Sequence, residues 1–258
     1  MIRPRCSGAG GHGLDALPAL PEPTRAQLFL AGISIVVALL LIAAVGVRLS
    51  ERIDLTQWWV PVALVAGVVA ADFVSGLLHW SADTWGRAEL PVIGPRFLVP
   101  FRVHHLNPDD FIARRFVDTN GDVAALTVPA LGGLLVLPLD TIWQQAFGIA
   151  CLGLCALGGM TNQIHQWAHM PVPPKLVRGF QRLGLVLRPR SHSTHHDRPY
   201  DANYCITTGW CNRPLEAVGF FRRLERAITR LTGVPPRADE QPSASAHSCK
   251  RGAMARHV

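Results

Sequence analysis

Long apolar runs constrain this chain more than any other feature. Residues 28–47 are twenty consecutive residues without a charge, and a helix that rises about 1.5 Å per residue crosses a hydrocarbon layer of about 30 Å at that length. Three more predominantly apolar runs lie at 59–80, 123–139 and 142–164. The sequence therefore predicts an all-α integral membrane protein with four transmembrane helices in one bundle. Only 17% of the 258 residues are charged, against about a quarter in soluble domains, so an ordinary soluble enzyme is excluded.

The distribution of Lys and Arg predicts the orientation of this bundle. With four spans, the N-terminal segment, the 81–122 loop and the C-terminal segment share one side and hold all but two of the 25 basic residues. Basic residues in short loops mark the cytoplasmic side, so both termini are expected in the cytoplasm. The net charge of +7 then lies against anionic lipid, which makes nucleic acid a poor candidate for a partner.

The remaining segments complete the predicted organisation. Residues 1–26 and 239–258 are expected to be disordered, and 27–238 to form one membrane domain. Pro174 to Leu187 has an apolar face with basic residues between, which suits a helix lying in the membrane interface. A second basic amphipathic helix is expected to start near Asn212 and to stop at Gly233 before Pro235.

Eight of the eleven histidines fall at the cytoplasmic end of a span or in cytoplasmic segments. Two lie four residues apart on a helix, where both imidazoles project from one face as paired metal ligands must, and three form an HxxHH box. One zinc takes at most four protein ligands, so eight histidines fit two ions. The predicted metal ligands are His79, His104, His105, His165, His169, His192, His195 and His196.

The identity of the metal is less directly constrained. Imidazole binds zinc, copper, iron and nickel, and no thiolate accompanies these histidines. A two-metal, all-nitrogen centre at a membrane surface nevertheless favours non-haem di-iron oxygen chemistry on a lipid chain. The sequence thus predicts a cytoplasmic, histidine-rich di-metal cap on the bundle.

Several stretches resemble the plasmanylethanolamine desaturase family. They are 72–86 (DFVSGLLHWSADTWG), 101–105 (FRVHH), 119–122 (TNGD), 163–169 (QIHQWAH) and 205–210 (CITTGW), with shorter matches at Asn212, 214–216, 223–225 and 236–239. The resemblance runs from about residue 70 to 240. It implies a lipid desaturase that forms the vinyl ether of plasmalogens, or, as in the related plant branch, desaturates an acyl chain of phosphatidylglycerol. Val103 and Arg115 depart from the ether-lipid branch, so they leave the substrate open.

The resemblance also implies what surrounds the eight histidines. They would ligate two irons, with O2 as co-substrate. Because no GxGxxG follows a strand, no bound NAD(P) or flavin is expected, and a separate carrier such as a cytochrome b5 or ferredoxin would supply electrons. Asp83, Asp197 and Asp201 are candidates to orient the imidazoles or to bind metal. Asp72, a carboxyl inside a span, is either functional or a helix-packing group. Arg96, Arg102, Arg114, Arg115, Lys175 and Arg178 are candidates for lipid head-group or donor binding.

Three rival functions stay open at this point. A membrane acyl-chain or sterol hydroxylase would share the histidine boxes and differ only in its product. A divalent-metal transporter would place its ligands near mid-membrane, where only Asp72 lies. An intramembrane zinc protease would need HExxH on a helix, but Gln166 follows His165.

Overall fold

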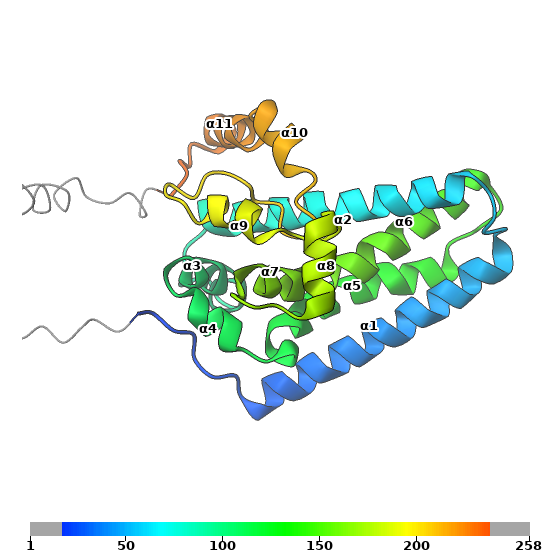
Figure 1. The fold of residues 1–258 in the computed structure, drawn as a ribbon, viewed down its shortest axis with the longest axis horizontal. Coiled ribbons are helices and arrows are strands. Elements are labelled where there is room, and N and C mark those ends of the chain that lie inside the picture. The colour runs from blue at the N-terminus through cyan, green and yellow to red at the C-terminus, as the bar shows by residue number, and fades with distance from the viewer. Residues whose placement is uncertain (1–16, 238–258) are drawn as a thin grey trace, which may run out of the picture.

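Residues 17–237 are described by the computed structural model, and within that range all regular secondary structure is helical. Four long helices run side by side (Figure 1): α1 (Arg25–Arg52), α2 (Trp59–Thr84), α5 (Phe116–Val136) and α6 (Ile142–Gly158). The first three are long and apolar enough to cross a membrane. The fourth reaches that length only together with α7 (Thr161–His169), from which it is bent by 41°.

Short helices form a cap at one end of this bundle. They are a π-helix at Gly94–Leu98, α3 (Val99–Leu106), α4 (Pro108–Ala113), α8 (Lys175–Leu183), α9 (Pro189–His195), α10 (Asn212–Ala217) and α11 (Phe220–Thr232). Both ends of the described chain lie at the cap end, whereas the α1–α2 and α5–α6 connections lie at the opposite end (Figure 1). The cap and both termini of the described chain therefore lie at the same end of the bundle.

Close helix contacts hold the bundle together. α1 packs on α5 and α2 on α6. At Gly67 of α2 a Cβ would overlap the backbone carbonyl of Ala150 on α6, so only glycine permits this approach, as is common where helices pack in lipid. Large side chains such as Leu40 and Val62 point outward and are exposed. So many exposed apolar side chains are unfavourable in water, but they are expected on a surface that faces lipid.

The predicted element boundaries were wrong at four places. The interfacial helix expected from Pro174 to Leu187 ends at Leu183, because Gly184 is left-handed. The third span begins at Phe116 rather than 123, because its first two turns are polar and enter the cap. The fourth run is not one straight helix, since it breaks at residues 159–160 before α7. The helix expected from Asn212 to Gly233 is two helices, because Gly219 adopts a left-handed conformation with φ 58°. Its predicted end at Gly233, also left-handed, is confirmed.

Residues 1–26 were predicted to be disordered. Of these, residues 17–26 are described by the structure, and they contact α4 and cap α1. The carbonyls of Leu20 and Pro21 accept hydrogen bonds from Arg114. Thr24 accepts one from the backbone N–H of Gln27, and so caps α1. Residues 1–16, like the tail predicted at 239–258, lie outside the described residues.

Candidate metal centre

The cap gathers the eight histidines from four separate segments. His79 lies in the last turns of α2, and α3 carries an adjacent pair of histidines. α7 carries two histidines one turn apart, and α9 together with the residue that follows it carries three. Together with Asp83 these side chains form two groups, in each of which the potential ligand atoms lie within 4.8 Å of one another. The histidines that the sequence analysis singled out therefore converge in space.

One group, called here the five-histidine group, consists only of imidazoles. Nε2 of His192 lies 2.8 Å from Nε2 of His165, 2.7 Å from that of His169 and 3.1 Å from that of His196. Nitrogens bound at about 2.0–2.1 Å to one ion lie roughly 3 Å apart, so these spacings suit ligands of a single ion. Its members are His104, His165, His169, His192 and His196.

The other group, called here the Asp83 group, combines three imidazoles with a carboxylate. Nε2 of His195 lies 3.1 Å from Nε2 of His79 and 3.2 Å from that of His105. Asp83 Oδ2 lies 3.4 Å from the Nε2 atoms of both His79 and His105. Nδ1 of His195 is 2.7 Å from the carbonyl oxygen of Ala202. If Nδ1–H donates to that carbonyl, the Nε2 lone pair is left free to face a metal.

Both groups contain polar atoms that the described protein leaves without a hydrogen bond. Nε2 of His104 and Oδ2 of Asp83 are buried and have no hydrogen-bond partner within residues 17–237. A buried polar group without a partner costs about 1–3 kcal/mol. Cations bound at the two groups would use both atoms, so the residues present fit the proposed metals.

Burial keeps the cap imidazoles in the form that binds metal. Desolvation lowers the pKa of His104 and of His192 well below the usual value of 6.5, and neighbouring imidazoles lower it further. Desolvation, followed by the charges of other histidines, lowers the pKa of His196 to about 2. These side chains are therefore neutral at pH 7, and a neutral imidazole is the metal-binding species.

Asp72 is buried in α2 and contacts backbone, not imidazole. Its Oδ1 accepts the N–H groups of Thr207, Thr208 and Gly209 at 3.2, 2.7 and 2.8 Å, and its Oδ2 accepts that of Cys211 at 2.9 Å. The carboxylate thereby fastens the 205–211 segment, which follows the HxxHH box, to the span. Of the two readings of Asp72, this geometry matches the packing role.

The other two candidate carboxylates lie away from the imidazoles. Asp197 is exposed. Asp201 binds Arg222 of α11 at 3.0 Å in a surface ion pair. Position next to the HxxHH box in the sequence was the reason to propose both, but the turn after α9 directs them outward.

Three of the six predicted basic residues make side-chain contacts within the protein. Arg96 pairs with Asp122, and the Arg102 guanidinium donates to the carbonyl oxygens of Ala82, Trp85 and Gly86. Arg114 pairs with Asp110 and Asp118 at 3.0 Å. Arg115 borders a hollow of the surface beside α1, and Arg178 borders another beside the histidines. Lys175, on α8, is exposed and lines neither hollow.

Sequence reasoning gave no role to three buried amides that position α7. Oδ1 of Asn120 accepts the backbone N–H of Gln163 at 3.0 Å. Nε2 of Gln166 donates to the carbonyl oxygens of Phe111 and Arg114 at 2.8 and 2.9 Å. Its Oε1 accepts a hydrogen bond from Nε2 of Gln163 at 2.9 Å. Because Gln166 lies between His165 and His169, these bonds hold the histidine-bearing turn against α4. The signal that the sequence offered for these three residues was that polar side chains interrupt, or directly follow, apolar runs.

Comparison with known proteins decides the family. Residues 68–239 match the lipid desaturase domain. The chain belongs to the lipid desaturase family. The resemblance noted in the sequence is thus confirmed, and with it the enzyme class, an oxidoreductase that desaturates lipid and is similar to plasmanylethanolamine desaturases.

Three relatives show the range of the family. The chain is 44% identical to a plasmanylethanolamine desaturase of Myxococcus xanthus, over 71% of this chain and 65% of that protein. It is 38% identical to mouse plasmanylethanolamine desaturase 1, over 90% and 88% of the two chains. It is 34% identical to the chloroplastic fatty acid desaturase 4-like 1 of Arabidopsis thaliana, over 72% and 62%. No solved structure matches the chain.

Proposed function

We propose that this enzyme is a membrane di-iron desaturase that introduces the vinyl ether double bond into the sn-1 alkyl chain of plasmanylethanolamine. The observation that carries the proposal is the pair of adjacent ligand groups, one with five imidazoles and one with three imidazoles and Asp83. The names of two relatives, from Myxococcus and mouse, supply the substrate.

Iron is the metal that best suits these ligands. Imidazole and carboxylate bind non-haem iron, whereas soft-metal and iron–sulfur sites require the thiolates that both groups lack. Two iron ions would supply the O2-dependent oxidation. We assign the eight histidines and Asp83 as the ligands, while Asp72 acts through the backbone it holds.

The overall reaction removes two hydrogen atoms from the ether chain. The substrate segment –O–CH2–CH2–, O2, two electrons and two protons give –O–CH=CH– and two molecules of water. The chain itself holds no sequence signature for NAD(P)H or flavin, so we assign the electrons to a separate carrier such as a cytochrome b5 or ferredoxin.

The protein residues contribute binding, orientation and exclusion of water. His79 and His195 are fully buried, which keeps water from the Asp83 group and prevents side reactions of the oxidant. The bond from His195 to Ala202 and the amides around Gln166 orient imidazoles from two sides of the centre. Rigid placement of the reacting C–H bonds lowers the barrier more than any one acid or base would.

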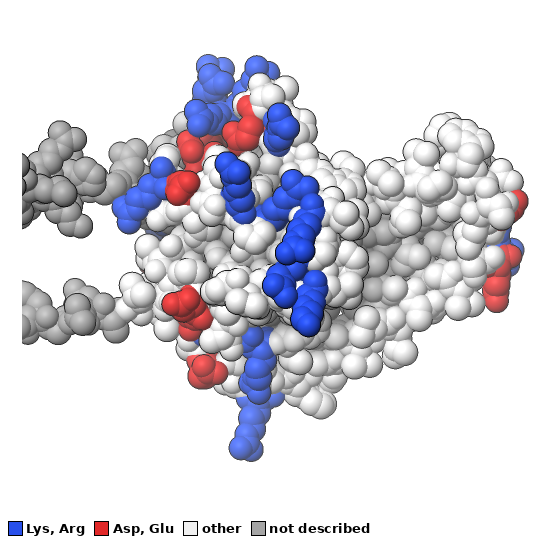
Figure 2. All heavy atoms as spheres, in the orientation of Figure 1, with Lys and Arg blue, Asp and Glu red and all other residues white. Residues whose placement is uncertain are grey.

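We further propose that the cap and both termini face the cytoplasm. The cap end carries most of the Lys and Arg visible in Figure 2, whereas the opposite end shows few charges. By the bias for basic cytoplasmic loops, the histidine groups then lie on the cytoplasmic side. An electron carrier in the cytoplasm would have access to that side.

A second candidate is desaturation of an acyl chain. The 34% identity to the Arabidopsis fatty acid desaturase favours it, and so do Val103 and Arg115. The chemistry would be the same, with the double bond placed in an ester-linked chain.

Lipid mass spectrometry separates these candidates. Cells that lack plasmalogens would be fed alkylglycerol and made to express this chain, a matching electron donor and, as control, the His165→Ala variant. Acid-labile vinyl ethers that appear only with the intact chain support the proposal. A new double bond in a phospholipid acyl chain, without vinyl ether, assigns the acyl-lipid reaction instead, and vinyl ether formation by His165→Ala would contradict the di-iron centre.

A further inference from the structure

One hollow of the cap opens onto the five-histidine group alone. Its volume is about 630 Å³, and His169, His192 and His196 form part of its lining. No residue of the Asp83 group lines it. The two metal positions therefore differ, since one borders a pocket and the other is enclosed by protein.

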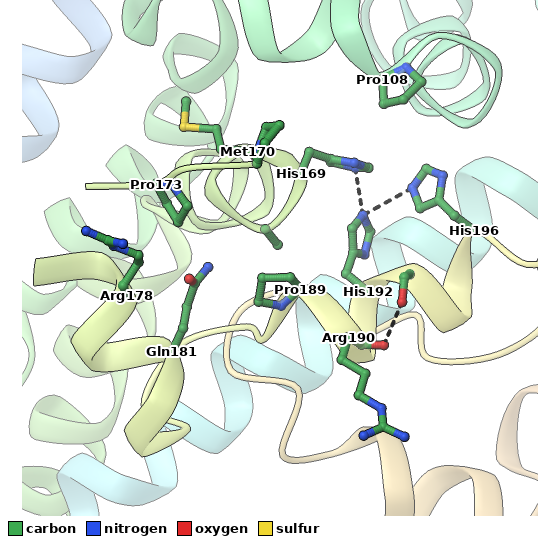
Figure 3. Close-up of a pocket in the computed structure, with 13 residues that line it drawn as sticks. Pro108, His169, Met170, Pro173, Arg178, Gln181, Pro189, Arg190, His192 and His196 are labelled. Carbon is green, nitrogen blue, oxygen red and sulfur yellow. Dashed lines mark hydrogen bonds between the residues drawn. The ribbon is translucent and has the colours of Figure 1, made fainter. Parts of the chain in front are cut away.

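The pocket has an apolar wall and a positive edge. Prolines 108, 171, 173 and 189 line it, and Arg178 and Arg190 stand at edges separate from the three imidazoles (Figure 3). No Asp or Glu is among its lining residues, and neither arginine forms an ion pair in the described part of the chain. Such a surface suits a molecule that joins an anionic group to hydrocarbon.

The helix beside the pocket places its opening at the depth of lipid head groups. α8 lies across the bundle, roughly perpendicular to the long helices (Figure 1). Its Leu176, Phe180 and Leu183 are 69%, 40% and 72% exposed, whereas Val177 and Gln181 face the protein. Arg178 and Arg182, one turn apart, both lie away from the exposed apolar face of this helix, and of the two only Arg178 lines the pocket. A helix with these faces lies in the membrane interface, so the pocket is open to lipid molecules.

We propose that this pocket binds the phosphate of the phospholipid substrate, with Arg178 and Arg190 as its contacts. The glycerol then spans the pocket, and the first carbons of the sn-1 chain reach the imidazoles of His169, His192 and His196. Guanidinium groups bind phosphate by charge-assisted hydrogen bonds. This inference rests on the proposed function for the choice of chain, but the binding of the phosphate is testable without catalysis.

Size and position argue against the acidic electron carrier as the occupant. The pocket is concave and of the volume that encloses a small molecule, whereas proteins dock on larger and flatter surfaces. A carrier is thus better placed elsewhere on the basic cap.

Thiol labelling measures occupancy directly. Ser193 lines the pocket and is exposed, so the Ser193→Cys variant, with Cys6, Cys151 and Cys249 replaced by serine, would be treated with maleimide in detergent. Lysophosphatidylethanolamine is expected to slow labelling about tenfold, and monoacylglycerol of the same chain length to have little effect. Thr194→Cys, exposed but outside the pocket, serves as the reporter control.

The arginine variants connect this protection to the proposed contacts. Arg178→Gln and Arg190→Gln should abolish the protection, Arg178→Lys should retain part of it, and Arg182→Gln should leave it intact. Equal protection by monoacylglycerol, full protection in both glutamine variants, or equal protection by inorganic phosphate alone would overturn the proposal. The last outcome would identify a simple anion site.

Turnover provides the second readout. For Arg178→Gln the ratio of kcat/KM for an alkyl phospholipid to that for its phosphate-free analogue should fall about tenfold, mainly through KM. Protection without any desaturation product would refute the proposed reaction and leave the phosphate site standing. Desaturation without selective protection would refute the phosphate site and leave the proposed reaction standing.

Discussion

Oδ1 of Asp72 accepts the backbone N–H of Thr208 at 2.7 Å, across 136 residues of sequence. The contact joins the interior of the second span to the segment that follows the last histidine box. Further bonds strengthen the junction: Ser75 Oγ accepts the N–H of Ile206 at 3.1 Å, and the Asn212 side chain binds both the N–H and the carbonyl of Cys205. This segment continues from the turn that orients His195.

Replacement of Asp72 by alanine should release the 205–211 segment. Four backbone N–H groups would lose their acceptor, and each buried group left unpaired costs about 1–3 kcal/mol. Hydrogen exchange by mass spectrometry should show lost protection at Thr207 to Gly209, with a lower unfolding temperature. Asp122→Asn, which breaks an exposed ion pair, is the control and should leave both unchanged. Intact protection in Asp72→Ala would contradict the clamp.

Substitutions in the two ligand groups should lower the iron content independently of each other. His192→Ala removes the imidazole that is nearest to three others and should leave about one iron per chain in place of about two. Asp83→Asn should lower occupancy of the other position and likewise end activity, since the proposed reaction requires both irons. Elemental analysis of purified protein measures this. His12→Ala, outside the described residues, is the control and should retain full iron. An unchanged iron content in His192→Ala would show that His192 is not a ligand.

Acid should destabilise the metal-free protein. Burial lowers the pKa of His104 and His192 below 6.5, so below about pH 6.5 the unfolded chain binds protons that the folded chain does not. Stability is therefore at its full value above that pH and falls as the pH decreases. The unfolding temperature of chelator-treated protein, measured between pH 7.5 and 5, should drop. A flat or rising profile would show that these imidazoles are not held neutral by burial.

Gln166→Leu should loosen the histidine turn without removing a ligand. The substitution leaves the carbonyls of Phe111 and Arg114 without their amide donor, at a cost of about 2 kcal/mol. We expect faster loss of iron to a chelator and reduced turnover. Gln145→Leu, whose amide donates to Leu139 at the far end of the bundle, should release iron at the parental rate. Equal rates in the two variants would refute a positioning role for Gln166.

Apolar periodicity was sufficient to predict the spans but not how they end. The start of α5 was missed because Asp118, Asn120 and Asp122 interrupt the apolar run, yet these residues belong to a helix whose first turns enter the protein cap. The break at Gly219 depends on one backbone angle, for which a glycine inside an amphipathic pattern is only weak evidence.

The sequence predicted which histidines come together, but not how they are arranged. Spacing identified paired histidines such as His165 and His169, because helical geometry makes residues four apart neighbours. Which histidines share an ion depends on contacts between α2, α3, α7 and α9, and no local pattern encodes them. Proximity in sequence also failed to rank the carboxylates. Asp83 lies one turn after His79 on the same face, whereas Asp197, next to His196, points to solvent.

The residues of α9 and its C-terminal neighbour contribute to both ligand groups: His192 and His196 to one, His195 to the other. During synthesis, which proceeds from the N-terminus, all four long helices precede this segment and emerge from the ribosome first. The Asp83 group is complete only when the chain has been made to residue 195, and the five-histidine group only at residue 196. A partly made chain that stops before residue 195 lacks ligands of both groups, so the proposed metals would bind only after all four long helices have been made.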